Sequence, residues 1–255
     1  MFGRNSILDN IPQAVKGLLI INVAVLVLSY IAEATMVNID VSRTIGLYFF
    51  KSELFKPFQI ITHMFMHGDF MHLIFNMYAL WVFGQVIERR WGAKKFLIYY
   101  FVTGFGAVVL HTFVNYLQYS DLIAGLSEDV VNMVINDGTK LLSSGKNWSD
   151  PNTGGLNLLL NTPTVGASGA VFGILLAFGM LYPNVELQLM FVPIPIKAKY
   201  FVMGYGAIEL YMGFQNAAGD NVAHFAHLGG MIFGFFLIKM WGTGNEDNGR
   251  WTIYN

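Results

Sequence analysis

The residues that could carry out a reaction lie in long apolar stretches of the chain, where polar side chains are costly. The notable ones are His72, Asn76, Ser168, Glu209, His224 and His227. A serine beside a histidine is the smallest activated nucleophile, because the imidazole takes the hydroxyl proton and later returns it to the leaving amine. Ser168 and His227 are therefore predicted to be the catalytic pair of a serine hydrolase.

A hydrolase of this kind also needs hydrogen-bond donors for the oxyanion of its tetrahedral intermediate. His72 and Asn76 are four residues apart, so they share one face of a helix, and both side chains can donate. The backbone N–H of Ser168 is a third donor if the serine begins a helix. These three groups are the predicted oxyanion donors.

The composition places these residues in a membrane protein. The chain has 255 residues, of which 55% are hydrophobic and 12% charged, with a mean hydropathy of +0.50. Soluble domains have about 25% charged residues. The net charge of -1 lacks the basic balance of a nucleic-acid binder, so no nucleic-acid partner is predicted. The absence of cysteine excludes disulfides, thiolate metal sites and cysteine nucleophiles.

Six apolar stretches approach the roughly 20 residues that a helix needs to cross a bilayer. They lie at 15–31, 70–87, 96–113, 165–181, 200–214 and 222–240. Barrel strands would be shorter and alternating, so the predicted fold is all-α, a six-helix transmembrane bundle forming one domain over residues 1–255. An extended outer loop is predicted at 114–164, with a capped helix from Ser127 to near Gly145, and a short cytoplasmic tail at 241–255.

The distribution of Lys and Arg sets the predicted orientation. With the N-terminus inside, ten of the 15 basic residues fall on the cytoplasmic side, among them Arg4, Arg250 and the cluster from Arg89 to Lys95. Both termini are therefore predicted to be cytoplasmic, with membrane lipid around the bundle. In this orientation the second, fourth and sixth stretches all begin at the outer face.

This shared direction brings four of the candidates to one depth. At about 1.5 Å of rise per residue, His72, Asn76, Ser168 and His227 lie within roughly one helical turn of one another, near the outer face. The predicted active site is therefore close to the outer surface of the membrane.

The remaining polar residues are predicted to lie outside the catalytic pair and the oxyanion donors. Glu209 enters from the opposite side and is predicted nearer the middle of the membrane, as a hydrogen-bonded structural residue. Asp220 lies just outside the last stretch. No carboxylate is therefore expected beside His227, and the prediction is a dyad without a third acid. His224, one turn earlier, is a rival base.

Glycines give a reason for the candidate pair to meet. Gly169 and Gly173 form one GxxxG pair, and Gly230 and Gly234 form a second. Small residues at this spacing let helix backbones approach closely in lipid. His227 shares a helix face with the second pair, which favours it over the rival base, and the candidate serine lies one residue from the first pair.

Each of these residues has a plainer explanation when taken alone. A serine among glycines or a lone asparagine more often serves helix packing than catalysis. Three alternatives therefore stay open: a catalytically inactive relative that binds membrane helices, a transporter or channel with histidines as proton or metal ligands, and a structural membrane protein. The chain has no HExxH motif and no aspartate within an apolar stretch, which excludes a zinc protease of that pattern and a paired-aspartate protease.

Three motifs in this order resemble the rhomboid family of intramembrane serine proteases. They are HGDFMHLIFN at 67–76, GASG at 166–169 and AHLGG at 226–230. They are similar to the family's second-span pattern, its GxSG motif and its last-span histidine with the glycines that follow. The resemblance covers residues 15–240 and implies, for the catalytic pair and the oxyanion donors, the roles given above.

The chain departs from the family pattern in two places. Many members have Trp-Arg where this chain has Phe58-Gln59, which puts any structural role of that pair in doubt. Phe172 stands where some members have a tyrosine stacked on the histidine. Phenylalanine keeps the ring and loses the hydroxyl.

The resemblance also implies a substrate and a location. The substrate is expected to be a membrane-anchored protein with one transmembrane helix, cut in or near the outer end of that helix. No cofactor and no metal are expected. The protein is expected to be a multi-pass integral membrane protein of the bacterial inner membrane, and no oligomeric state is predicted.

Overall fold

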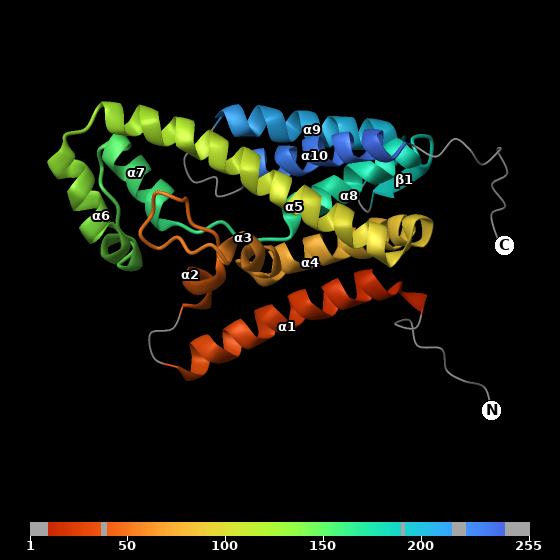
Figure 1. Cartoon of the computed structure of the whole chain (residues 1–255), viewed down its shortest axis with the longest axis horizontal. Helices are drawn as coiled ribbons and strands as arrows, with labels where there is room; N and C mark the ends of the chain where they lie inside the picture. The colour runs from red at the N-terminus through yellow and green to blue at the C-terminus, as the bar shows by residue number, and fades with distance from the viewer. Residues whose placement is uncertain (1–9, 37–39, 190–191, 216–222, 243–255) are drawn as a thin grey trace.

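The computed structural model describes residues 10–36, 40–189, 192–215 and 223–242, and most of this part is helical (Figure 1). The helices that overlap the predicted stretches are α1 (Gln13–Thr35), α4 (Phe70–Ala79), α5 (Gln85–Ala124), α8 (Ser168–Leu181), α9 (Ala198–Gln215) and α10 (His224–Trp241). A mostly helical fold is therefore confirmed. The predictions made for Arg4, Asp220, Arg250 and nearly all of the tail at 241–255 fall outside the described residues.

One continuous helical run contains both the second and the third predicted stretch. A π-helical turn at Leu80–Gly84 joins α4 to α5, and Gly92 interrupts the helical geometry inside α5 with φ 77° and ψ 160°. L side chains are strained at such a positive φ, so this position requires glycine. Figure 1 shows the chain running out along α4 and returning as α5.

Two stretches of the described residues are long and apolar enough to cross a membrane by length and composition, Gln13–Thr35 and Phe70–Ala124. The second holds two of the predicted spans. Helix α8 is also apolar but has only 14 residues. The count of six spans therefore stays a prediction.

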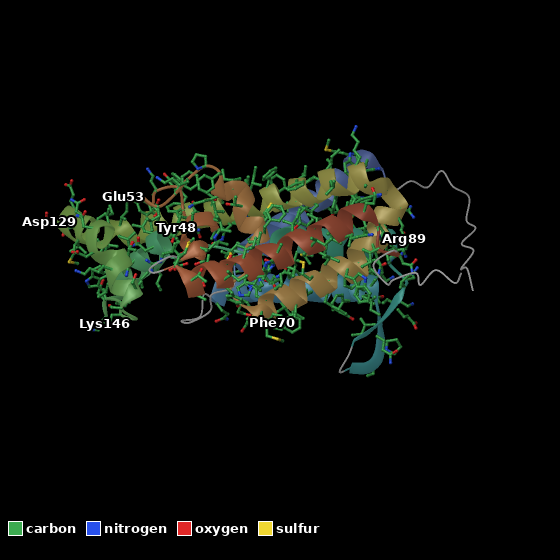
Figure 2. The ribbon with its side chains drawn as sticks, turned by 90° about the horizontal axis from the view of Figure 1, so that it is seen from below. Tyr48, Glu53, Phe70, Arg89, Asp129 and Lys146 are labelled. Atoms are coloured by element: carbon green, nitrogen blue, oxygen red, sulfur yellow. The ribbon has the colours of Figure 1, made fainter. Side chains whose placement is uncertain are left out.

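The outer faces of several helices are apolar. Leu28 on α1 is 63% exposed and Phe214 on α9 is 75% exposed. Charged side chains lie at the two ends of the molecule, with Arg89 at one end and Asp129 and Lys146 at the other (Figure 2). Large exposed apolar faces of this kind indicate contact with lipid or protein.

Helix α8 forms the centre of the bundle. It packs against α5, α10, α9 and α4, and most of its residues from Gly169 to Gly179 are buried. A helix that is apolar on all sides needs such a position, because every face must be covered. Ser168, its first residue, therefore lies at the end of the central helix.

Helix α5 extends farther than predicted. Between Gly92 and Ala124 it is about 48 Å long at 1.5 Å per residue, whereas the hydrocarbon core of a bilayer is about 30 Å thick. The helix therefore continues 11 residues beyond residue 113, where the predicted membrane span ends. The extra turns mix polar and apolar residues, so they carry no membrane signal, but Tyr119 and Leu122 pack against the helices that follow.

The segment predicted as an outer loop is a helical cap. It consists of α6 (Glu128–Ser143) and α7 (Pro151–Asn161) at one end of the molecule (Figure 1). These helices share a small core of their own, formed by Phe49, Val134, Leu156 and Leu160. The Ser127 side chain accepts a hydrogen bond from the Val130 N–H, so α6 begins where the sequence predicts.

A β-hairpin is an exception to the all-α prediction. Strands β1 (Glu186–Leu189) and β2 (Val192–Lys197) pair antiparallel between α8 and α9, with Glu186 opposite Lys197. The prediction missed this hairpin because it considered only stretches long enough to cross the membrane. The residues of β2 alternate between β-branched residues and proline, a period that fits a short strand.

Gln59 organises the connection between α1 and α4, which contains α2 (Val41–Ile45), α3 (Gln59–Thr62) and a 3-10 turn at His63–Phe65. Its buried side chain accepts a hydrogen bond from Lys56 N at 2.9 Å and donates to the carbonyls of Leu54 at 3.1 Å and Thr44 at 3.3 Å. Its neighbour Phe58 is exposed. The Phe58-Gln59 pair therefore keeps a structural role, and the glutamine carries it.

We expect Gln59→Met to destabilise the protein by about 2 kcal/mol or more, because it leaves buried backbone groups without hydrogen-bond partners. Thermal unfolding in detergent measures this change. Gln13→Met is the control, because Gln13 is exposed at the start of α1. Equal unfolding temperatures for the two variants would contradict a structural role for Gln59.

Candidate active site

Ser168 begins α8 directly after a turn that only glycine can make. Gly166 has φ 128°, and a Cβ there would lie 2.9 Å from His72 Cε1 and Nε2 and 3.5 Å from Ser168 Oγ. The glycine is thus required both by the backbone conformation and by the close approach of the His72 ring. It lets His72 and Ser168 face one another across the turn.

The candidate nucleophile and base come from different helices and are in hydrogen-bond contact. His227 Nε2, in the first turn of α10, lies 2.8 Å from Ser168 Oγ. The rival base His224 directs its Nδ1 to Glu209. The structure therefore brings together Ser168 and His227, the pair that the sequence analysis favoured.

Backbone contact between α8 and α10 makes this approach possible. A Cβ on Gly230 would overlap the carbonyl oxygen of Gly169, so the predicted close approach is seen at this pair. The other two glycines contact α5 instead. A Cβ on Gly173 would meet Thr103, and one on Gly234 would meet the Tyr99 hydroxyl. The glycines therefore form a contact among three helices, where the sequence analysis expected two.

A buried carboxylate lies beside the histidine, contrary to the prediction. Glu209 Oε2 lies 2.8 Å from His227 Nδ1 and 2.6 Å from His224 Nδ1. The depth of Glu209 was judged from the inner end of its helix. Counted from the other end of α9, at Gln215, it is only about 9 Å along the helix axis, within reach of the first turn of α10. The expectation of no carboxylate beside His227 is therefore wrong.

Aromatic rings cover the face of the imidazole. Phe172 stacks on His227 with ring centroids 4.1 Å apart and planes inclined by 5°. Tyr205 of α9 stacks on the other side of Phe172 at 5.1 Å and 11°. Phe172 therefore keeps the stacking expected of a ring at this position. The stack limits rotation of the imidazole, so the two ring nitrogens stay directed to Glu209 and Ser168.

The two predicted side-chain oxyanion donors differ in their contacts. His72 lies beside the serine, as the approach to Gly166 shows. Asn76 is buried one turn later, and its Nδ2 donates to the carbonyl of His72 at 2.9 Å. An amide nitrogen carries two protons, so one N–H remains for another acceptor. The Asp69 side chain fixes the start of this helix by accepting from the His72 N–H at 2.8 Å.

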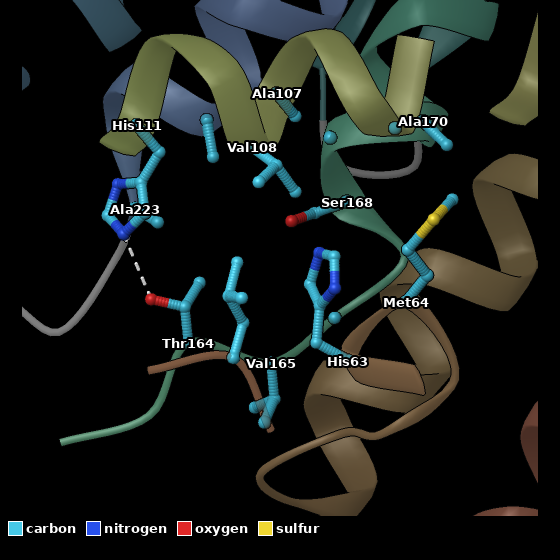
Figure 3. Close-up of a pocket in the computed structure, with 15 residues that line it drawn as sticks. His63, Met64, Ala107, Val108, His111, Thr164, Val165, Ser168, Ala170 and Ala223 are labelled. Atoms are coloured by element: carbon cyan, nitrogen blue, oxygen red, sulfur yellow. Dashed lines mark hydrogen bonds between the residues drawn. The ribbon is translucent and has the colours of Figure 1, made fainter. Parts of the chain in front are cut away.

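A small pocket opens next to the serine (Figure 3). The Ser168 hydroxyl points into it, and His63 and Val165 form part of its wall. His111 Nε2 lies 3.0 Å from the Thr164 hydroxyl at its edge. The pocket has room for about one water molecule. The sequence analysis did not select these polar residues, because none of them stands in a motif with the serine.

Two histidines in the connection before α4 are held in the neutral form. Burial lowers the pKa of His63 to about 4, and its Nδ1 donates to the Gln59 carbonyl at 2.8 Å. Burial and the neighbouring His72 lower the pKa of His67 to about 4. The His67 and His72 rings meet edge to face at 5.0 Å. These two histidines are therefore uncharged at neutral pH.

Comparisons with known proteins agree on one family. A family model described as the rhomboid domain matches residues 54–243. The relatives include the "RHOMBOID-like protein 12, mitochondrial" of Arabidopsis thaliana, 29% identical over 86% of this chain, and the "Rhomboid protease GluP" of Bacillus subtilis, 27% identical over 72%. The "Rhomboid protease AarA" of Providencia stuartii is 29% identical over 68% of this chain. The chain covers 55%, 26% and 52% of the lengths of these three relatives.

We expect Gly230→Ala to force α8 and α10 apart, because the new methyl group would overlap the backbone of Gly169. The expected cost is about 1–3 kcal/mol of stability, as in other overpacked cores, together with loss of the reactivity of Ser168. Thermal unfolding and labelling by a serine-reactive probe measure the two effects.

Gly204→Ala is the matched control, because a Cβ on this exposed glycine of α9 meets nothing within 4 Å. It should leave labelling unchanged and stabilise the helix slightly. If Gly230→Ala behaved like Gly204→Ala, the backbone contact would not be what brings the serine and histidine together.

Proposed function

Because this chain belongs to the rhomboid family, whose proteins are intramembrane serine proteases, we propose that it is a serine endopeptidase of membrane-anchored proteins. In this proposal Ser168 is the nucleophile and His227 the general base. The observation that carries it is the 2.8 Å contact between Ser168 Oγ and His227 Nε2. Two separate helices supply these atoms, so their contact depends on the whole bundle.

The proposed reaction follows from this contact. Nε2 of His227 takes the hydroxyl proton as Oγ of Ser168 attacks the carbonyl carbon of the substrate. The same proton passes to the leaving amine when the tetrahedral intermediate collapses, which leaves an acyl group on the serine. Water then attacks that ester with the histidine again as base, and the new carboxyl end is released.

The oxyanion of the intermediate needs donors close to the serine. His72 lies next to Ser168 across the Gly166 turn, and the backbone N–H of Ser168 is free of helical hydrogen bonds because it begins α8. We assign both to the oxyanion hole, with Asn76 as a further donor through its second amide proton. Removing one such donor from a serine protease typically lowers the rate by about 10²–10³.

The membrane position belongs to the same proposal. The rhomboid family is an integral membrane family, and the candidate residues His72, Ser168 and His227 all lie in the first turns of their helices. In the proposed six-span arrangement with both termini in the cytoplasm, these first turns are near the outer face. The relatives are mitochondrial and bacterial proteins alike, so they do not favour the bacterial inner membrane in particular.

The proposed substrates are membrane proteins with a single transmembrane helix. A peptide bond inside a helix is hydrogen-bonded and shielded, so the substrate must unwind locally before Ser168 can attack. Helix-breaking or small residues near the cut reduce the cost of unwinding. The helical cap formed by α6 and α7 stands at the outer end of the bundle in this orientation, where it would meet the outer part of a substrate.

We expect a fluorophosphonate probe to label Ser168 in the native protein, because the probe reacts with hydroxyl groups that a neighbouring base activates. Labelling should disappear in Ser168→Ala and in His227→Ala, while both variants keep their thermal unfolding transition. In-gel detection of the probe and mass spectrometry of the labelled peptide measure this outcome.

Ser120→Ala is the control for nonspecific reaction, since the Ser120 hydroxyl on α5 donates to the Tyr116 carbonyl of its own helix. It should label like the native protein. A native protein that takes no label would favour a family member that binds membrane helices without cutting them. Ion transport that persisted in Ser168→Ala would instead favour a transporter.

We expect Asn76→Ala to lower kcat by about 10²–10³ with little change in KM, if the amide stabilises the oxyanion. Cleavage of a model transmembrane substrate in detergent measures both constants. Asn22→Ala is a close match, because the buried Asn22 amide likewise donates to the carbonyl four residues earlier, at 2.7 Å. Equal kcat values for the two variants would remove Asn76 from the oxyanion hole.

A further inference from the structure

Three titratable side chains form a buried group, Glu209, His224 and His227. The proposed chemistry uses only His227 and leaves the other two without a role. The carboxylate comes from α9 and the two imidazoles from the first turn of α10. One carboxylate oxygen, Oε2, contacts Nδ1 of both rings, at 2.6 Å for His224 and 2.8 Å for His227. This arrangement joins a third helix to the candidate catalytic pair.

The contact determines which nitrogen of His227 carries the proton. An ionised carboxylate can only accept hydrogen bonds, so His227 donates its Nδ1–H to Glu209. In the neutral ring the other nitrogen, Nε2, then has no proton and is an acceptor. That nitrogen is the one 2.8 Å from Ser168 Oγ. The carboxylate therefore selects the tautomer in which His227 can act as a base.

The environment makes this selection strong. Glu209 is 5% exposed and His227 is 7% exposed, and an ionised carboxylate in an apolar interior needs hydrogen-bond partners. The second imidazole, His224, supplies another donor to the same oxygen. Phe172 holds the face of the His227 ring, while Glu209 holds its edge. Together these contacts leave the imidazole one orientation.

A metal ion is the other occupant that these residue types could suit, since two histidines and a glutamate are common zinc ligands. Ligands 2.0–2.1 Å from one tetrahedral zinc lie about 3.3 Å from each other. Both nitrogens are closer than this to Oε2. Their distances are those of charge-assisted hydrogen bonds, so the geometry favours a shared carboxylate over a metal centre.

We propose that Glu209 is a positioning residue that holds His227 in the Nδ1-protonated tautomer and stabilises the imidazolium formed when Ser168 attacks. The inference rests on the proposed protease function. It replaces an isolated Ser-His pair with a chain of hydrogen bonds from Ser168 through His227 to Glu209. The carboxylate touches no substrate and acts only through the histidine.

The kinetic experiment compares the full-length native protein with Glu209→Gln in detergent, using a model transmembrane substrate. Glutamine keeps the size of the side chain and removes its charge. We expect kcat to fall at least about tenfold and by as much as about 10⁴, the effect of neutralising the acid of a serine-protease triad, while KM stays within about threefold. Only a group that acts in the transition state gives this split.

Glu88→Gln is the matched control. Glu88 is 4% exposed and also accepts two hydrogen bonds, from the N–H groups of Ala14 and Val15 at the start of α1. The control should lower the unfolding temperature and leave kcat within about twofold. A kcat for Glu209→Gln equal to that of the control would overturn the proposal, because Glu209 would then serve stability alone.

A second measurement does not depend on catalysis. The chain has six histidines, so selective ¹⁵N labelling of their rings gives a spectrum that single substitutions can assign. We expect His227 to carry its proton on Nδ1 and none on Nε2, with the Nδ1 proton shifted downfield by the carboxylate. This proton should move upfield in Glu209→Gln, since a neutral amide is a weaker acceptor.

The two measurements separate the possible failures. A proton on Nε2 of His227 in the native protein would overturn the positioning role whatever the activity. The expected tautomer in a protein that cleaves nothing would uphold the geometry and reject the protease function. Loss of cleavage on adding EDTA, with recovery on adding zinc, would replace the hydrogen-bonded carboxylate with a metal site.

Discussion

The proposed chemistry depends on two helix backbones touching. A serine and a histidine have short side chains, so their tips meet only when the helices that carry them are closer than ordinary side chains allow. Gly230 on α10 faces the carbonyl of Gly169 on α8 without any side chain between them. Lipid supplies no hydrophobic force that would pull two apolar helices together, so close packing of small residues has to hold them. A third helix, α5, also holds α8 and α10 together. Its Tyr99 packs against Gly234 of α10, and the Tyr99 hydroxyl donates a hydrogen bond to the Gly173 carbonyl of α8 at 2.8 Å.

The cost of polar groups in an apolar bundle accounts for how the rest of the site is arranged. Three polar side chains near Ser168 are paired with other polar groups: His227 with Glu209, His63 with the Gln59 carbonyl, and Asn76 with the His72 carbonyl. Such pairing keeps buried groups from losing their hydrogen bonds. It also fixes the direction of each ring or amide, so the same contacts that make burial tolerable orient the candidate catalytic atoms.

The sequence predicted the parts of this site that follow from spacing along one helix. The positions of the helices, the shared depth of Ser168 and His227, and the need for glycine at their crossing all follow from apolar length, rise per residue and side-chain size. The spacing of residues along one helix cannot predict which side chain of a neighbouring helix each residue contacts. Glu209 was misplaced because depth alone was used. Three of the four glycines, Gly169, Gly173 and Gly234, pack on α5 because this third helix fits beside them. The polar pocket residue His63 comes from a connection with no periodic pattern, so no rule of spacing pointed to it.

Helix α9 is joined to the candidate chemistry by two separate contacts. Tyr205 stacks on Phe172, which in turn stacks on His227, and Glu209 holds the edge of the same imidazole. The ring is therefore held on its face through one residue of α9 and on its edge by another, about one turn apart on that helix. A displacement of α9 relative to α8 and α10 would change both contacts together. The orientation of His227 toward Ser168 thus depends on three helices. Helix α9 also carries exposed apolar side chains on its outer face, such as Phe214. It therefore links the orientation of His227 to the lipid or protein that packs against the outside of the bundle.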